Sequence, residues 1–118
     1  MVSEHPLVSV HPETGEKILF TNAAYVDHIV GLTPRESQCL LEYLWEHCLQ
    51  PEFTIRFRWS AGSIAFWDNR ATQHQAIGDI FDTDFDRELY RVTLNGGVPV
   101  GTDGRKSTAI SGGSIKPV

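Results

Sequence analysis

The histidine at position 74 is the first residue whose type and position could support catalysis. It ends the polar stretch D-N-R-A-T-Q-H at 68–74, which follows the apolar run S-I-A-F-W at 63–67. A histidine in such a place is either a hydrogen-bonded structural residue or a metal ligand, and the residue types alone favour the structural role. His74 is therefore a candidate metal ligand that needs support from other residues.

Arg87 and Arg91 form the second candidate group. They lie four residues apart in R-E-L-Y-R at 87–91, so in a strand both belong to one face and are separated by about 13 Å. Guanidinium groups on a covered face need anions. The anions are either nearby aspartates, which the residues alone favour, or the carboxylate or sulfonate of a bound ligand. The aspartates of this region are Asp79, Asp82, Asp84 and Asp86.

A non-haem Fe(II) site needs two histidines and one carboxylate, so His74 alone is not sufficient. The usual local signal for the other two ligands is H-x-D or H-x-E, and one instance occurs, His11-Pro12-Glu13. The stretch P-E-T-G at 12–15 is typical of a turn, so we interpret His11 and Glu13 as turn residues rather than ligands. The sequence contains no C-x-x-C pair, Gly-rich phosphate loop or G-x-S-x-G elbow.

A hairpin and a helix are predicted in the first half of the chain. The runs L-V-S-V at 7–10 and K-I-L-F at 17–20 flank the turn, which indicates two paired strands. The stretch T-P-R-E at 33–36 forms a capping box with proline in the first helical position, and it begins a helix at 34–48. The apolar residues of this helix recur at helical spacing, so one face is expected to pack against other elements.

Three further strands are predicted after the helix, at 53–60, 63–67 and 88–94. The first alternates apolar and polar residues, and the second is continuously apolar, as in a central strand. Several short strands with one helix indicate a mainly β sandwich or barrel that carries an amphipathic helix on its outside. Residues 101–118 are rich in Gly, Ser and Lys, which predicts a flexible tail after a domain at 1–100.

Composition limits the classes of partner. A chain of 118 residues suits one domain or part of one, and the net charge of −5 argues against nucleic acid. No apolar run reaches the roughly 18 residues of a membrane span. The start has no signal-peptide pattern, so we expect a cytoplasmic protein. Cys39 and Cys48 lie on opposite sides of the predicted helix, which excludes a disulfide there and predicts thiols that are either buried or inert.

Three stretches together resemble the C-terminal half of the taurine dioxygenase (TauD/TfdA) family of Fe(II)- and 2-oxoglutarate-dependent dioxygenases. They are HPETGEKILFTNAAYVDHIVGLTPRES, PEFTIRFRWSAGSIAFWDNRATQHQAIGD and RELYRVTLNG. The likeness covers about residues 5–100, and the pattern W-D-N-R-x-x-Q-H followed by R-x-x-x-R is highly specific. The resemblance implies part of a double-stranded β-helix, also called a jelly roll, with the amphipathic helix on the outside.

The resemblance also implies a role for each candidate residue. His74 matches the distal histidine of the iron triad, and Arg87 matches the arginine that pairs with 2-oxoglutarate, the co-substrate. Arg91 matches the arginine that faces the substrate's anionic group. The implied substrate is a small anionic organic compound, an alkylsulfonate or alkyl sulfate before an aryloxyalkanoate, oxidised with dioxygen. On this interpretation His74 and both arginines point into one cavity.

The H-x-D pair of the family lies upstream, in a half that this sequence does not contain, so two iron ligands are expected elsewhere. Two alternatives stay open beside the dioxygenase hypothesis. The chain could be a non-catalytic fragment or one half of a split enzyme, associating with a missing N-terminal half or with itself through exposed sheet edges. It could also be an unrelated β-domain that binds an anionic partner through its arginines.

Overall fold

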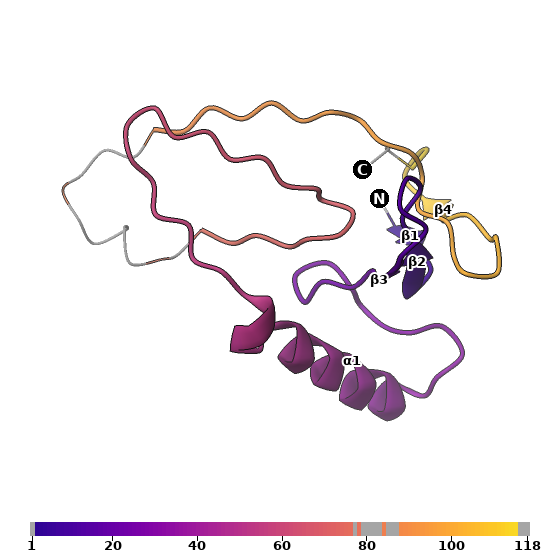
Figure 1. The fold of residues 1–118 in the computed structure, drawn as a ribbon. Helices are drawn as coiled ribbons and strands as arrows, with labels where there is room; N and C mark the ends of the chain where they lie inside the picture. The colour runs from indigo at the N-terminus through magenta and orange to yellow at the C-terminus, as the bar shows by residue number, and fades with distance from the viewer. Residues whose placement is uncertain (1, 77, 79–83, 85–87, 116–118) are drawn as a thin grey trace.

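The structure is a computed structural model that describes residues 2–76, 78, 84 and 88–115 (Figure 1). The elements in chain order are β1 (Val2–Glu4), β2 (Val8–Val10), β3 (Lys17–Leu19), α1 (Pro34–Cys48), the 3-10 helix η1 (Pro51–Phe53) and β4 (Thr108–Ser111).

Strands β2 and β3 form the predicted hairpin. They pair antiparallel, with Val8 opposite Leu19 and Val10 opposite Lys17. The amide of Gly15 donates to the carbonyl of His11 at 2.9 Å, and Gly15 has φ +74°, a conformation that glycine adopts without steric cost. The turn chemistry of H-P-E-T-G therefore closes the hairpin as the sequence predicts.

Strands β1 and β4 pair antiparallel and join the two ends of the chain. Residues 108–111 thus form a hydrogen-bonded strand, which differs from the flexible tail predicted for 101–118. The amide of Val10 donates to the carbonyl of Val100 at 2.8 Å, so the segment that precedes β4 is also bonded to the hairpin. A polar, glycine-rich stretch can be ordered when a neighbouring strand satisfies its backbone groups.

Helix α1 has the predicted bounds and the predicted capping box at Thr33. The side chain of Leu41 is 2% exposed, and it is the one apolar side chain classed as buried within the described ranges. The indole Nε1 of Trp45 donates to Oγ1 of Thr21 at 2.9 Å, which ties the helix to the chain that follows β3. Both cysteines are free, Cys39 is exposed and Cys48 is half-buried, so neither is fully buried and their inertness stays a prediction.

The strands predicted at 53–60, 63–67 and 88–94 are not strands in this structure. Phe53 ends η1, and the rest of these three described stretches has no ladder pairing and appears as coil in Figure 1. Ile55 is 92% and Phe66 94% exposed, so these stretches contribute no buried face. An extended segment becomes a strand only where a neighbour accepts and donates its backbone hydrogen bonds.

The accessible surface area is larger than that of a compact monomer, which agrees with an incomplete core. The accessible surface is 10251 Å² for 13.2 kDa, whereas a compact monomer of that mass exposes about 6400 Å². The described residues form two two-stranded sheets, one α-helix and one 3-10 helix, and they do not form a closed jelly roll. Within the described residues, no helix has the length and apolar character to cross a membrane.

Candidate functional site

The loop that leads to His74 is folded around Asp68. The carbonyl of Asp68 accepts from the amides of Ala71 and Thr72, at 3.2 and 2.9 Å, and from the Thr72 hydroxyl at 2.7 Å. Its carboxylate accepts from the amide of Arg70 at 2.8 Å. Aspartate favours such turns because its side chain bonds the backbone two residues on, so D-N-R-A-T forms a compact turn rather than an open loop.

His11, in the hairpin turn, holds this loop from the other side. Its Nδ1 accepts from the amides of Glu13 and Thr14, at 3.3 and 3.2 Å. The ring proton therefore lies on Nε2, which donates to the Asp68 carboxylate at 2.9 Å. Because His11 is 7% exposed and both of its nitrogens have partners, this imidazole has one fixed tautomer and no lone pair left for a metal.

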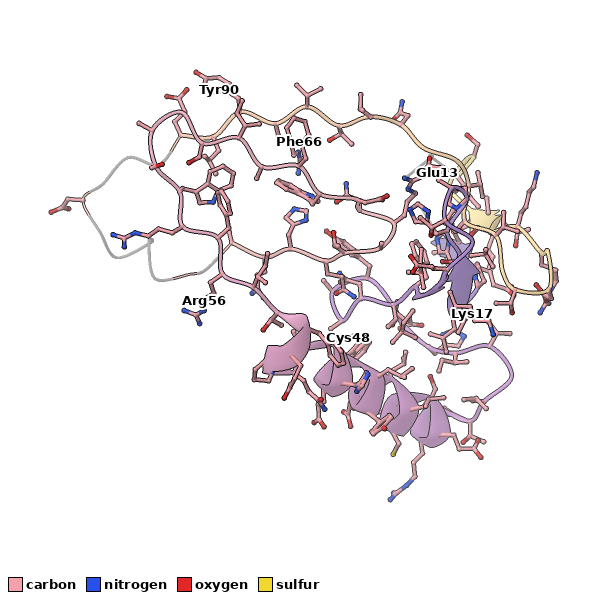
Figure 2. The ribbon with its side chains drawn as sticks, in the orientation of Figure 1. Glu13, Lys17, Cys48, Arg56, Phe66 and Tyr90 are labelled. Carbon is pink, nitrogen blue, oxygen red and sulfur yellow. The ribbon has the colours of Figure 1, made fainter. Side chains whose placement is uncertain are left out.

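Arg70 bridges the carboxylates of two distant segments. Its guanidinium donates to both oxygens of Glu13, at 3.0 and 2.8 Å, and to both oxygens of Asp68, with the shortest contact at 2.6 Å. Figure 2 shows Glu13 at the hairpin end that carries the turn. The Arg70 hydrogen bonds hold the pKa of Asp68 far below its ordinary value, with a second contribution from His11, and they lower the pKa of Glu13. The two carboxylates raise the pKa of Arg70 in return.

His11, Glu13 and Asp68 bring three potential ligand atoms within 4.8 Å of one another. In this structure the Arg70 guanidinium already supplies the positive charge that the two carboxylates require. The interpretation of His11 and Glu13 as turn residues agrees with this geometry. We refer to His11, Glu13, Asp68 and Arg70 as the ionic clamp.

A second anchor lies at the end of the loop. The side-chain amide of Gln73 donates to the carbonyl of Thr21 at 2.6 Å and accepts from the side chain of Asn22 at 3.3 Å. Thr21 is buried and also accepts from Trp45 of α1. His74 therefore follows directly after a residue that is fixed to the segment between β3 and α1.

The ring of His74 packs against Trp67, with the ring centroids 4.7 Å apart and the planes tilted by 48°. Trp67 is itself oriented by a 3.0 Å bond from its Nε1 to the side chain of Asn69. His74 and Arg91 are both exposed in this structure, and their placement in one cavity with Arg87 stays a prediction. Arg87, which the sequence predicts to bind 2-oxoglutarate, lies outside the described residues.

Neither the ionic clamp nor the anchor at Gln73 was predicted from the sequence. The only signal for the clamp was the occurrence of opposite charges two residues apart in D-N-R and of H-x-E in a turn. Neither pattern indicates that the two segments meet, because the contacts join residues 57 positions apart.

The comparisons with known proteins identify the family. The family described as "Taurine catabolism dioxygenase TauD, TfdA family" matches residues 1–93. An α-ketoglutarate-dependent sulfate ester dioxygenase from Pseudomonas putida is 48% identical over 105 residues, which cover 89% of this chain and 34% of that protein.

Two solved structures from Burkholderia xenovorans share the fold. A taurine dioxygenase superposes with a TM-score of 0.91 at 66% identity. The matched region covers 94% of this chain and 40% of that protein's chain. A second protein, described as a "Putative Alpha-ketoglutarate-dependent Taurine Dioxygenase", gives a TM-score of 0.94 at 63% identity, over 98% and 43% of the two chains. This chain thus spans about two fifths or less of the relatives it matches, and it belongs to the TauD/TfdA family of dioxygenases.

Proposed function

We propose that this chain is the part of an Fe(II)- and 2-oxoglutarate-dependent dioxygenase that supplies the His74 ligand of the iron. The observation that carries the proposal is the placement of an exposed imidazole at the end of a loop with two separate anchors. Membership of the family supports a ligand role for this imidazole. The location in the cytoplasm stays a prediction.

Such an iron site needs three protein ligands, and His74 would be one of them. An exposed histidine is a suitable ligand, but the 2-His-1-carboxylate arrangement needs a second histidine and a carboxylate. The ionic clamp does not supply them, because the nitrogens of His11 and the oxygens of Asp68 are occupied by hydrogen bonds. We propose, from the resemblance to the family, that the remaining ligands are an H-x-D pair in polypeptide outside this sequence. When bound, the iron with 2-oxoglutarate supplies the chemistry that activates dioxygen, and the protein orients the reactants.

Arg91 is the proposed partner of the substrate's anionic group, and Arg87 that of the 2-oxoglutarate carboxylate. A guanidinium binds a sulfonate, sulfate or carboxylate with two parallel hydrogen bonds, which fixes both position and orientation. The relatives named above are described as acting on a sulfate ester and on taurine. We therefore propose an alkylsulfonate or alkyl sulfate as the substrate class, oxidised at the carbon next to the sulfur-containing group.

The domain at 1–100 is proposed to complete a jelly roll with strands from the missing part of the polypeptide. Residues 54–60, 63–67 and 88–94 run without ladder partners and expose large apolar side chains. Arg56, Phe66 and Tyr90 mark these three segments in Figure 2. Strands added beside them would bury those side chains and satisfy the backbone groups at the same time.

The test is a reconstitution. The chain is mixed with a polypeptide that comprises the remaining length of the Burkholderia xenovorans taurine dioxygenase, and 2-oxoglutarate decarboxylation is measured with Fe(II) and an alkyl sulfate. We expect turnover by the complex, none by either part alone, and none with His74→Ala. Turnover that survives His74→Ala would refute the role of His74.

The hypothesis of a non-catalytic fragment makes a different prediction for the same experiment. It predicts that a stable complex forms, because the exposed apolar segments are covered, but that no combination decarboxylates 2-oxoglutarate. The sequence alternative of an unrelated anion-binding domain is excluded by the family match over residues 1–93.

A further inference from the structure

We infer that Asp68 and Arg70 are positioning residues that, through the ionic clamp, fix the location of His74 relative to the hairpin. This inference rests on the proposed function, since it assigns a purpose to holding His74 still. Neither residue is proposed to touch the metal, the co-substrate or the substrate.

The Asp68 carboxylate is saturated with hydrogen bonds from the protein. Oδ1 accepts from the amide and Nε of Arg70, both at 2.8 Å. Oδ2 accepts from His11 at 2.9 Å and from the Arg70 guanidinium at 2.6 Å. A carboxylate offers about four lone-pair sites, and all four are directed to protein donors. Asp68 is thus committed to holding the loop and has no capacity for another ligand.

The clamp also joins two segments that lie far apart in the sequence, the hairpin turn and the loop before His74. Arg70 is 23% exposed at its side chain and contacts Glu13 at a separation of 57 residues. Its fork binds two carboxylates at once, which one ammonium group cannot reproduce with the same geometry. The start of the loop is therefore fixed to the hairpin, whereas Gln73 fixes its end to Thr21.

The rings of Trp67 and His74 flank the two anchored residues, Asp68 and Gln73. Trp67 precedes Asp68, His74 follows Gln73, and the two rings pack at 4.7 Å. A displacement of the Asp68 turn would move Trp67 directly and would change this ring contact. The distance between the two rings therefore reports the position of His74 without any metal being present.

The experiment compares Asp68→Asn, Arg70→Met and Arg70→Lys with the wild type in two measurements. Nuclear Overhauser effects between the Trp67 and His74 rings are recorded on the 118-residue chain. Co(II) affinity is measured on the chain reconstituted with the complementary part of the Burkholderia xenovorans enzyme. In Asp68→Asn the new amide group meets the donors of Arg70 or His11, so the clamp opens on one side.

In Asp68→Asn and Arg70→Met we expect the nuclear Overhauser effect between the two rings to be at least twofold weaker. We also expect the Co(II) affinity to fall by about tenfold or more, which is typical when a group that orients a ligand is removed. Arg70→Lys should recover part of both signals, because it keeps the charge and loses the fork. Asp103→Asn is the matched control, since Asp103 pairs with Arg105 in an exposed turn and has no contact with the loop. It should match the wild type in both measurements.

Failure of this inference can be told apart from failure of the proposed function. If His74→Ala abolishes Co(II) binding while the clamp variants leave both measurements unchanged, the positioning role is wrong and His74 remains a ligand. If His74→Ala leaves Co(II) affinity unchanged, the proposed function fails. Should Asp68→Asn or Arg70→Met unfold the chain, Glu13→Gln carries the test, because the Glu13 side chain is 68% exposed and its replacement buries nothing.

Discussion

Nε2 of His11 lies 2.9 Å from the Asp68 carboxylate, although the two residues are 57 positions apart in the sequence. The contact makes the hairpin turn and the loop before His74 one structural unit. Because His11 is buried and its other nitrogen accepts two backbone amides, the ring cannot turn without breaking three hydrogen bonds. The position of the proposed iron ligand thus depends on a turn near the beginning of the chain.

This unit should be sensitive to acid. The pKa of Asp68 is lowered mainly by the Arg70 hydrogen bonds, and that of Glu13 is lowered by the same guanidinium. Carboxylates with a lower pKa in the folded state stabilise it above their unfolded pKa of about 4 and lose that contribution as the pH falls further. We expect Asp68→Asn to be less stable than the wild type at pH 7, with the difference narrowing between about pH 4 and pH 2.

Urea unfolding followed by circular dichroism across this pH range measures the difference. The control is Asp103→Asn, which removes a carboxylate whose pKa is also lowered but whose pair joins residues only two positions apart. Its effect at pH 7 should be smaller. If the difference in the free energy of unfolding between the wild type and Asp68→Asn stays constant down to pH 2, the Asp68 carboxylate is not the source of the acid sensitivity.

The bond between Trp45 and Thr21 should contribute to stability and to the anchor at Gln73. Thr21→Val keeps the shape but removes the acceptor of the indole N–H, so the free energy of unfolding should fall by about 1–3 kcal/mol. Thr21→Ser retains the hydroxyl and should lose less. The measurement is urea unfolding followed by tryptophan fluorescence, and equal losses in Thr21→Val and Thr21→Ser would show that the hydrogen bond is unimportant.

The exposed apolar segments should make the isolated chain associate with itself. Ile55 and Phe66 are almost fully exposed on segments without ladder partners, and large apolar surfaces of this kind favour association. We expect the sedimentation coefficient of the wild type to rise with concentration, and the rise to be smaller in the double variant Ile55→Lys, Phe66→Lys. Tyr43→Lys changes an exposed aromatic residue on helix α1 and serves as the control. If the sedimentation coefficient rises equally in all three proteins, these segments are not the cause of the association.

The helix and the hairpin could be predicted because their signals are local. T-P-R-E at 33–36 specifies the start of α1 through contacts three residues apart, and H-P-E-T-G closes the hairpin within one turn. The prediction of a metal ligand at His74 came from a motif, and Arg87 and Arg91 stay predictions. Family membership was predicted from the motif W-D-N-R-x-x-Q-H and is confirmed by the family match.

The predicted strands at 53–60, 63–67 and 88–94 failed for a physical reason. Alternation and apolar runs show what a segment would bury. A strand also needs a neighbour, and among the residues that the structure describes none is paired with these segments. The ionic clamp was missed for a similar reason. In the sequence, nothing distinguishes Glu13, Asp68 and Arg70 from ordinary charged surface residues. Only the fold brings them together.

The central claim is that the imidazole of His74 binds the iron of a site completed by other polypeptide. The direct measurement is an anaerobic Fe(II) titration of the reconstituted complex, with His74→Ala compared with His28→Ala, which removes another exposed histidine. We predict one Fe(II) bound tightly by the wild type and by His28→Ala, and no tight binding by His74→Ala. Tight binding of one Fe(II) by all three complexes would contradict the account.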